Sequence, residues 1–242
     1  PQEREQLIVD AASVNDRVIV VLEGGGAITM QDWLADPEAV LMVWYPGQMG
    51  GHAIADLLFG DLSPSGKLPF TVPKSLDQLP PFDNVSLEVE YGYFHGYRYL
   101  DRRGFTPEFP FGFGLGYTSF AVSDLRVSRS QAGAGETVTF SVDVENTGPV
   151  AGGEVVQLYV SYPDSEVERA ERELKGFAKV VLEPGERRTV RIDIPIDSLA
   201  YYDSDRSEWI LEALEYVVHG GTSSRDLPLS VTLSVDSEAI AR

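Results

Sequence analysis

Hydrophobic positions along the first 75 residues alternate between a helical and a strand-like pattern. Residues 7–14 place apolar side chains about 3.6 positions apart, which predicts a helix with one buried face. Residues 17–23 and 39–45 are short continuous apolar runs, the pattern of strands that are covered on both faces. Asp36 and Pro37, just before the second run, offer a helix N-cap and a first helical residue, so a helix start is expected there.

Two further elements are expected in this part of the chain. Residues 52–59, which follow two glycines, predict a second helix, and residues 67–73 predict a third strand. Strands that are separated by helices pair in parallel through right-handed crossovers. The expected fold class of residues 1–75 is therefore α/β, with a mostly parallel sheet.

The hydrophobic period changes to two from about residue 120. In residues 136–148 apolar and polar side chains alternate, the pattern of a strand with one face in a core and the other in water. Similar segments follow, separated by clusters of Gly, Pro, Asn and Asp, and give about seven short strands. Residues 120–242 are therefore expected to form an antiparallel β-sandwich, so the chain reads as α/β followed by all-β.

Residues 76–119 fit neither pattern. They are rich in Pro, Gly and aromatic side chains, and they run into the stretch "FTPEFPFGFGLGYTSF". This composition is too aromatic for a flexible linker and predicts an ordered connector packed between the two domains. The expected boundaries are 1–75, 76–119 and 120–242.

Composition and charge exclude several classes of function. The sequence has 38 acidic and 19 basic side chains, and its formal net charge of -19 repels nucleic acid and anionic lipid. The absence of cysteine excludes disulfides, thiolate zinc sites and cysteine nucleophiles, while it leaves the compartment open. His52, His95 and His219 lie far apart without ligand spacing, so neither a metal site nor a cofactor is expected.

The start of the sequence bears on what surrounds it. The first residues, "PQEREQLIVD", lack the basic-then-apolar order of a secretory signal, and no window approaches 18 consecutive apolar residues. A membrane partner is therefore not expected. The chain begins without methionine and inside an expected helix, so we expect it to be the later portion of a longer protein.

Two glycine-rich stretches share part of the pattern of nucleotide-binding motifs. Gly60 and Gly66 are too far apart for a P-loop. A P-loop also follows a strand and precedes a helix, whereas the turn at Gly66 follows a predicted helix and precedes a predicted strand. The stretch "LEGGGA" does follow a strand, but Thr29 stands where a dinucleotide fingerprint requires its third glycine. Neither stretch predicts a phosphate cradle, and the glycines at 24–26 fit a tight turn at the end of a strand.

Carboxylates are the remaining candidates for chemistry, because a serine-hydrolase elbow, Gly-x-Ser-x-Gly, is absent from the sequence. Glu23 ends a predicted strand, and ligands of open α/β sheets lie at that edge, so Glu23 is a candidate pocket-edge residue. An ordinary strand-end acid is the alternative. Glu88 and Glu90 precede an aromatic run suited to stacking on sugars, or are solvated acids. Residues 165–173, "SEVERAERE", are expected to form a solvated charged loop or sheet edge.

In order along the chain, these motifs resemble the carboxyl-terminal part of glycoside hydrolase family 3, the β-glucosidases and related exo-acting enzymes. The resemblance covers nearly all 242 residues and rests on long strings that include "AVLMVWYPGQMGGHAIADLLFGDLSPSGKLPFTVP", "FPFGFGLGYTSF" and "RELKGFAKVVLEPGE". It implies a (β/α)8 barrel, then an α/β sandwich domain, then a fibronectin type III-like domain. Residues 1–75 resemble only the last part of the α/β sandwich domain, and residues 120–242 the fibronectin type III-like domain.

The resemblance also implies a retaining hydrolysis of terminal β-D-glucosyl residues, in which an aspartate attacks the sugar and a glutamate acts as acid/base. The family's nucleophile lies on the barrel and its acid/base glutamate on a loop that precedes the segment similar to residues 1–9. No catalytic residue is therefore expected within these 242 residues. The partners that it implies are the N-terminal barrel portion, in the same polypeptide or as a separate chain, and a glycoside substrate; a homodimer stays open.

Two positions depart from the family pattern. Family members usually carry an acid where Met49 stands, so the polar contact of that acid is not expected here. The turn before the last strands, usually Glu-Pro-Gly-Glu, has Ala213 and Leu214 at its centre, which leaves its conformation open. The alternative to an enzyme segment is a non-catalytic module that contacts carbohydrate or protein.

Overall fold

The computed structural model describes residues 2–81, 83, 85–236 and 238–240. Its N-terminal part contains the elements α1 (Gln2–Val14), β1 (Ile19–Glu23), β2 (Ala39–Trp44) and α2 (Gly50–Phe59). The strands β1 and β2 pair in parallel, as the alternation of strand and helix predicts. The first helix, both apolar strands and the second helix are therefore confirmed.

A small core holds this α/β part together. Met30, Trp33 and Val72 are buried and pack against apolar side chains of α1, β1 and β2. Parallel sheets are usually buried on both faces and contain more than two strands. In contrast, several apolar side chains here are exposed by a third or more, namely Leu7, Ile19, Val21, Leu58 and Phe59. This part of the fold leaves apolar surface open to a further layer.

Two of the expected elements are wrong. No helix starts at Asp36, because the backbone N–H of Glu38 donates to the carbonyl oxygen of Val18 at 2.9 Å and draws the chain straight into β2. Residues 67–73 form no strand. Two prolines in this segment lack a backbone donor, and the remaining amides of Leu68 and Val72 bond instead to carbonyl oxygens of the connector, at 2.8 and 2.9 Å.

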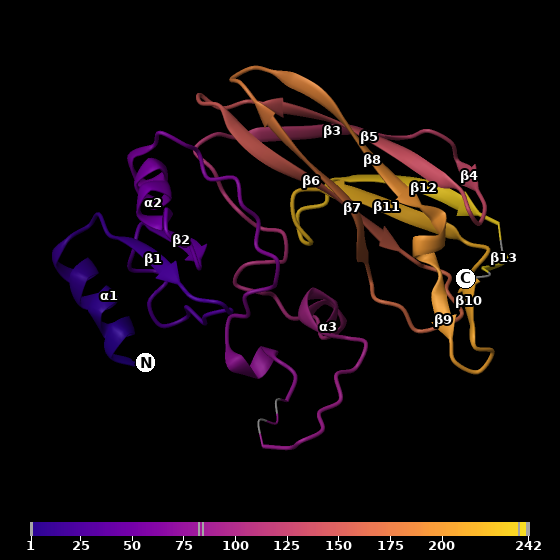
Figure 1. Ribbon diagram of the computed structural model, residues 1–242, viewed down its shortest axis with the longest axis horizontal. Coiled ribbons are helices and arrows are strands. Elements are labelled where there is room, and N and C mark those ends of the chain that lie inside the picture. Colours follow the sequence, from indigo (N-terminus) through magenta and orange to yellow (C-terminus); the bar gives the residue numbers. More distant parts are fainter. Residues whose placement is uncertain (1, 82, 84, 237, 241–242) are drawn as a thin grey trace.

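The connector contains η1 (Leu76–Gln78) and α3 (Gly96–Arg102), and α3 lies between the α/β part and the sandwich (Figure 1). Tyr97 of α3 packs against Phe111 and, edge-on, against Tyr159 of the sandwich, with ring centroids 5.1 and 5.9 Å apart. The aromatic side chains of this segment therefore join it to the sandwich, as its composition predicts.

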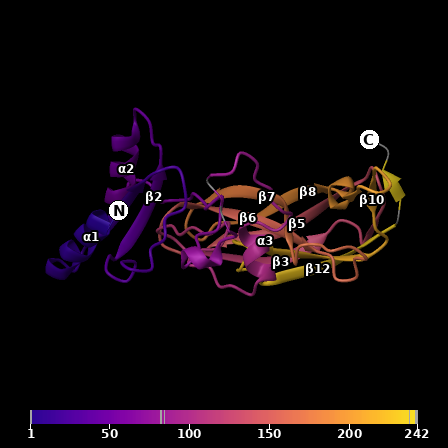
Figure 2. The ribbon, with the colours of Figure 1, turned by 90° about the horizontal axis from the view of Figure 1, so that it is seen from below.

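The C-terminal part consists of two main sheets and a small third one (Figures 1 and 2). The larger sheet has the order β4-β12-β11-β6-β7, the facing sheet β3-β5-β8, and the small sheet β13-β10-β9. The strands are β3 (Phe120–Val127), β4 (Gln131–Ala132), β5 (Thr137–Asn146), β6 (Gly152–Ser161), β7 (Glu173–Leu182), β8 (Arg187–Pro195), β9 (Tyr201–Asp203), β10 (Glu208–Leu211), β11 (Glu215–Gly221), β12 (Leu229–Val235) and β13 (Glu238–Ile240). A short helix, η2 (Ile196–Leu199), connects β8 to β9. Among the described residues, no helix has the length and apolarity needed to cross a membrane.

The core of the sandwich confirms the period of two. Val138, Phe140, Val142 and Val144 of β5 are each at most 1% exposed and point into the space between the two main sheets. Nearly all neighbouring strands are antiparallel; the short β4 pairs in parallel with β12. The fold class is therefore α/β followed by an antiparallel β-sandwich.

Candidate functional site

The carboxyl ends of β1 and β2 form the edge at which parallel sheets bind ligands. Glu23 ends β1 and lies opposite Trp44, which ends β2. Its side chain is exposed, and the next residue, Gly24, donates its N–H to the carbonyl oxygen of Trp44 at 3.1 Å. Glu23 thus lies at the edge that the sequence indicates, and a role in a pocket stays a prediction.

A tyrosine accompanies Glu23 at this edge. Trp44 has a left-handed backbone with φ 55°, and the chain turns there so that Tyr45 is 80% exposed. A Cβ added to Gly25 would lie 2.5 Å from the Tyr45 hydroxyl oxygen, so glycine at this position lets the ring lie against the loop. The edge therefore presents a carboxylate and an aromatic ring to solvent.

The other two candidate carboxylates lie elsewhere. Glu88 and Glu90 are exposed on the extended part of the connector, where the flanking Leu87 and Tyr91 are also exposed. In the part of the chain that the structure describes, no hydrogen bond or ion pair joins Glu23, Glu88 and Glu90 to one another.

Met49 occupies the N-cap position of α2. Its side chain is 62% exposed, and α2 begins without a side-chain capping hydrogen bond. A carboxylate at this position would interact favourably with the unpaired N–H groups and the dipole at the start of the helix. That interaction is absent at Met49.

The turn "SPSGK" joins the α/β part to the sandwich. The Nζ atom of Lys67 lies 2.7 Å from Oε1 of Glu154 on β6 and donates to the carbonyl oxygen of Gly114 at 2.8 Å. Both side chains of the ion pair are largely buried. From β7, Lys179 donates to the hydroxyl and carbonyl oxygens of Ser65. Lys67 thus serves as a structural clamp between three segments.

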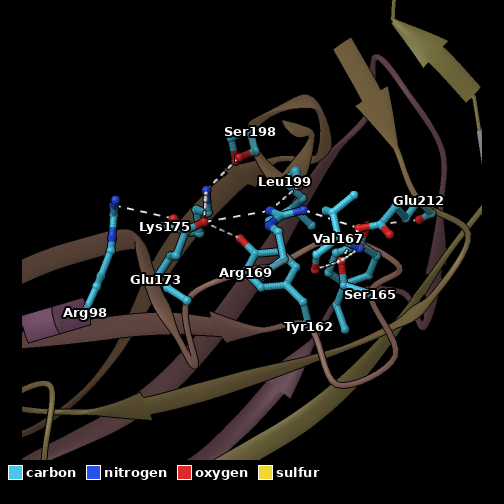
Figure 3. A network of polar contacts seen from close by, with 12 residues as sticks. Arg98, Tyr162, Ser165, Val167, Arg169, Glu173, Lys175, Ser198, Leu199 and Glu212 are labelled. Carbon is cyan, nitrogen blue, oxygen red and sulfur yellow. Dashed lines mark hydrogen bonds and ion pairs between the residues drawn. The ribbon is translucent and has the colours of Figure 1, made fainter. Parts of the chain in front are cut away.

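Residues 165–173 are only in part the solvated loop expected from their charges, because Glu166, Glu168 and Glu171 are exposed while Arg169 and Glu173 are buried. Glu173 is 6% exposed, and the side chain of Arg169 is 7% exposed. The two lie at the centre of the network in Figure 3, where side chains from the connector and from the sandwich converge on the Glu173 carboxylate. For these two residues the expectation fails, because charge composition alone does not distinguish a solvated loop from one whose charges pair inside the fold.

Glu173 accepts hydrogen bonds on both carboxylate oxygens. The hydroxyl of Tyr93, from the connector, donates at 2.9 Å, and the hydroxyl of Tyr162 donates at 2.7 Å. Three cations surround the same group at N···O distances of 3.1, 3.5 and 3.8 Å, namely Lys175, Arg98 and Arg169. The connector is therefore fastened to the sandwich at one buried carboxylate.

The charges of the network respond to burial in opposite senses. Burial by itself would raise the pKa of Glu173, but the adjacent Lys175 ammonium, the Tyr162 hydroxyl and Arg98 outweigh it and lower that pKa to about 2. Burial lowers the pKa of Lys175, although Glu173 partly compensates. Glu173 is therefore a permanent anion at neutral pH rather than a proton donor.

Arg169 links Glu173 to a second carboxylate. Its guanidinium lies 3.7 Å from the ring centroid of Tyr162 and donates to the carbonyl oxygen of Leu199 at 2.9 Å and to Oε2 of Glu212 at 3.4 Å. Glu212 also accepts from the hydroxyl of Ser165 and the backbone N–H of Glu166, at 2.7 and 2.9 Å. The segment around Ala213 and Leu214 is thus held through Glu212, which sequence reasoning missed. In the sequence, only the closely spaced Arg and Glu residues at 168–173 indicate that an ion-pair network could form here.

A second buried carboxylate joins α3 to the sandwich. The side chain of Asp101 is 1% exposed, and its oxygens lie 2.6 Å from Arg225 and 3.8 Å from Arg172. Burial raises the pKa of Asp101, and the two guanidinium groups oppose the rise. Among the described residues, no cluster of His, Asp and Glu has the arrangement of a metal site. Together these buried groups fix segments in place.

Comparison with known proteins gives two matching domains. Residues 1–117 match the Glycosyl hydrolase family 3 C-terminal domain, and residues 154–224 match the Fibronectin type III-like domain. The two matches follow the change from the α/β part to the sandwich that the structure shows.

Relatives along the whole chain are similar in sequence and in fold. The thermostable beta-glucosidase B of Acetivibrio thermocellus is 42% identical over 242 residues, which are 98% of this chain and 32% of that protein. An exo-alpha-(1->6)-L-arabinopyranosidase of Bifidobacterium breve is 38% identical over the same share of each chain. The solved structure of beta-glucosidase 3B from Thermotoga neapolitana with alpha-D-glucose superimposes with a TM-score of 0.90 at 35% identity, over 99% of this chain and 34% of that one. This chain spans about a third of the length of the relatives it matches.

Proposed function

This chain belongs to glycoside hydrolase family 3, and from that premise we propose that it is the C-terminal segment of a retaining, exo-acting β-glycosidase. The proposed substrate is a glycoside with a terminal non-reducing β-D-glucosyl residue. The observation that carries the proposal is the similarity to the thermostable beta-glucosidase B along 98% of this chain. The arabinopyranosidase at 38% identity shows that relatives of this segment serve other sugars, so the glucosyl preference is the finer part of the proposal.

The proposed task of this segment is support rather than chemistry. Retaining hydrolysis requires two carboxyl groups about 5 to 5.5 Å apart, one as nucleophile and one as acid/base. We place both in the N-terminal portion of the protein. The contribution of this chain is to hold the loop that carries the acid/base group, because small displacements at a catalytic centre cost large factors in rate.

Two observations support this division of labour. The buried carboxylates Glu173 and Asp101 are both held in ion pairs between segments, and Glu173 is kept charged, so Glu173 does not serve as a general acid at neutral pH. The two-stranded sheet of the α/β part exposes apolar side chains such as Ile19 and Val21. We propose that the N-terminal portion covers them, in the same polypeptide or as a separate chain.

We also propose the domain boundaries 1–75, 76–119 and 120–242. The change from the two-stranded sheet to the connector and the start of β3 at Phe120 support them. Within the α/β part, Glu23 is proposed as a pocket-edge residue without a catalytic role, since it lies at the ligand-binding edge of a parallel sheet.

Hydrolysis of 4-nitrophenyl glycosides tests the proposal. The 242-residue chain alone is expected to show no turnover of 4-nitrophenyl β-D-glucoside. The longest natural polypeptide that contains this chain is expected to hydrolyse the glucoside with retention of the anomeric configuration. Turnover by the chain alone would contradict the placement of the catalytic carboxylates and would make Glu23, Glu88 and Glu90 the first positions to replace by glutamine. A preference of the long polypeptide for the α-L-arabinopyranoside would contradict the glucosyl assignment.

A further inference from the structure

A groove of about 800 Å³ lies in the sandwich, beside the network of Figure 3. One wall is the segment between β6 and β7, the other is η2 with the β9–β10 hairpin, and Tyr93 of the connector also contributes. Its volume falls within the range of about 300 to 1,000 Å³ that is typical of ligand sites in proteins. The support function proposed above does not require this groove.

Aromatic side chains line the groove. Tyr93, Tyr201, Tyr202 and Trp209 all contribute, and Tyr202 is 52% exposed. The rings of Tyr202 and Trp209 meet edge to face, with centroids 5.5 Å apart at 63°. This contact fixes the orientation of the Tyr202 ring while part of the ring stays open to solvent. A fixed, half-exposed ring is a suitable platform for the apolar face of a ligand.

The charged groups of the groove select against anions. Five acidic and two basic side chains line it, and both basic groups, Arg169 and Lys175, are already paired with Glu173. Asp203 and Asp205 on the hairpin add carboxylate oxygens, and each such oxygen can accept more than one hydrogen bond, so Asp203 retains acceptor capacity beside its ion pair with Arg206 at 3.5 Å. The ligand that fits is therefore neutral, rich in hydroxyl donors, and flat and apolar on one face.

The walls of the groove are held in position before any ligand arrives. The Arg169 guanidinium fixes η2 through the carbonyl oxygen of Leu199, and Lys175 donates to the carbonyl oxygen of Ser198 at 2.8 Å. On the hairpin, the Asp203 carboxylate accepts from the backbone N–H groups of Asp205 and Arg206. Preorganised walls lower the ordering cost of binding.

We propose that this groove binds a neutral oligosaccharide, with the Tyr202 ring stacked on one sugar and the Asp203 and Asp205 carboxylates accepting hydrogen bonds from its hydroxyl groups. Sugars combine an apolar C–H face with many hydroxyl donors, which is the combination that the groove offers. The site would hold an oligosaccharide on the sandwich without cleaving it. It rests on the groove alone and not on the proposed hydrolysis.

Isothermal titration of the 242-residue chain with cellotetraose tests this inference. Saturable binding of one cellotetraose per chain is expected, with no binding of tetragalacturonate, which is anionic. Tyr202→Ala is expected to raise the dissociation constant about tenfold, because the stacking platform is lost. Tyr202→Phe is expected to keep the dissociation constant within about twofold of the wild-type value. Phe177→Ala is the matched control, since Phe177 is an exposed aromatic on β7 of the same sandwich and does not line the groove.

Three outcomes would overturn the inference. These are the absence of saturable binding to the wild-type chain, binding that Tyr202→Ala leaves unchanged in a folded variant, and equal losses in Tyr202→Ala and Phe177→Ala. Circular dichroism of each variant establishes that it is folded, and Tyr202→Phe separates loss of the ring from loss of the hydroxyl. Because no hydrolysis is measured, failure of the glucosidase proposal leaves this result unaffected.

Discussion

Replacing Glu173 by glutamine removes the one anion on which Arg98, Arg169 and Lys175 converge. Glutamine has nearly the same shape but only one acceptor oxygen, so one of the two tyrosine hydroxyls loses its acceptor. Arg98 and Lys175 lose their counter-ion, while Arg169 keeps Glu212. Removing one partner of a buried ion pair typically costs about 3 to 5 kcal/mol. We therefore expect Glu173→Gln to lower the free energy of unfolding by about 3 kcal/mol at pH 7.

The pKa of Glu173 gives the same magnitude by another route. It is lowered from 4.5 to about 2 in the folded state, and at about 1.4 kcal/mol per pKa unit this shift is worth roughly 3 kcal/mol. A carboxylate with a depressed folded pKa contributes its full stability above the unfolded pKa and loses it as the pH falls through the folded pKa. The difference between wild type and variant should therefore be constant above about pH 5 and shrink to about 1 kcal/mol near pH 3.

Urea unfolding, followed by circular dichroism between pH 3 and pH 7, measures this difference directly. Glu168→Gln is the matched control, because Glu168 lies on the same segment but its side chain is 65% exposed in its pair with Arg102. The control is expected to change stability by less than about 0.5 kcal/mol. Equal stabilities of Glu173→Gln and wild type at pH 7, or a difference that does not vary with pH, would refute the reasoning.

Three further predictions follow from other contacts. Lys67→Met should destabilise the fold by about 3 kcal/mol, since it strands the buried Glu154, and the double variant with Glu154→Gln should recover much of this loss; additive effects in a double-mutant cycle by urea unfolding would contradict the clamp. Met49→Asp should raise the free energy of unfolding by about 0.3 to 1 kcal/mol, because a carboxylate interacts favourably with the unpaired N–H groups at the start of α2; the measurement is a salt-sensitive rise in melting temperature. No rise at low salt would contradict this stabilisation of the helix N-terminus. Gly114→Ala should cost about 1 to 3 kcal/mol, because the added Cβ would lie 2.2 Å from the Gly66 carbonyl oxygen, whereas Gly25→Ala meets only the movable ring of Tyr45 and should cost far less; similar melting temperatures for the two variants would refute this distinction.

Periodic patterns in the sequence predicted the regular elements well. The period of two in β5 and the apolar runs of β1 and β2 succeed because burial of alternating or continuous side chains is a local property of a strand. The expected strand at residues 67–73 fails because its prolines cannot donate to a ladder, and the amides of Leu68 and Val72 bond to the connector. Local propensity thus fails where a distant segment supplies the hydrogen-bond partners.

The candidate site was less predictable, for the same reason. Glu23 was placed correctly at the end of a strand, because that depends on neighbouring residues alone. Arg169, Glu173 and Glu212 were assigned to solvent or missed, because a charge becomes buried only where partners from other segments neutralise it. The hydroxyl of Tyr93 and the guanidinium of Arg98 come from about 75 to 80 residues earlier in the chain, and composition cannot place them.

The long sequence separation of the Glu173 contacts sets an order of events during synthesis. Tyr93 leaves the ribosome 80 residues before Glu173, its hydrogen-bond partner. At about 5 to 20 residues per second, the connector waits roughly 4 to 16 seconds for its anchor. During that interval Tyr93 and Arg98 lack the carboxylate that holds them, so this part of the connector can dock on the sandwich only after β7 has been synthesised.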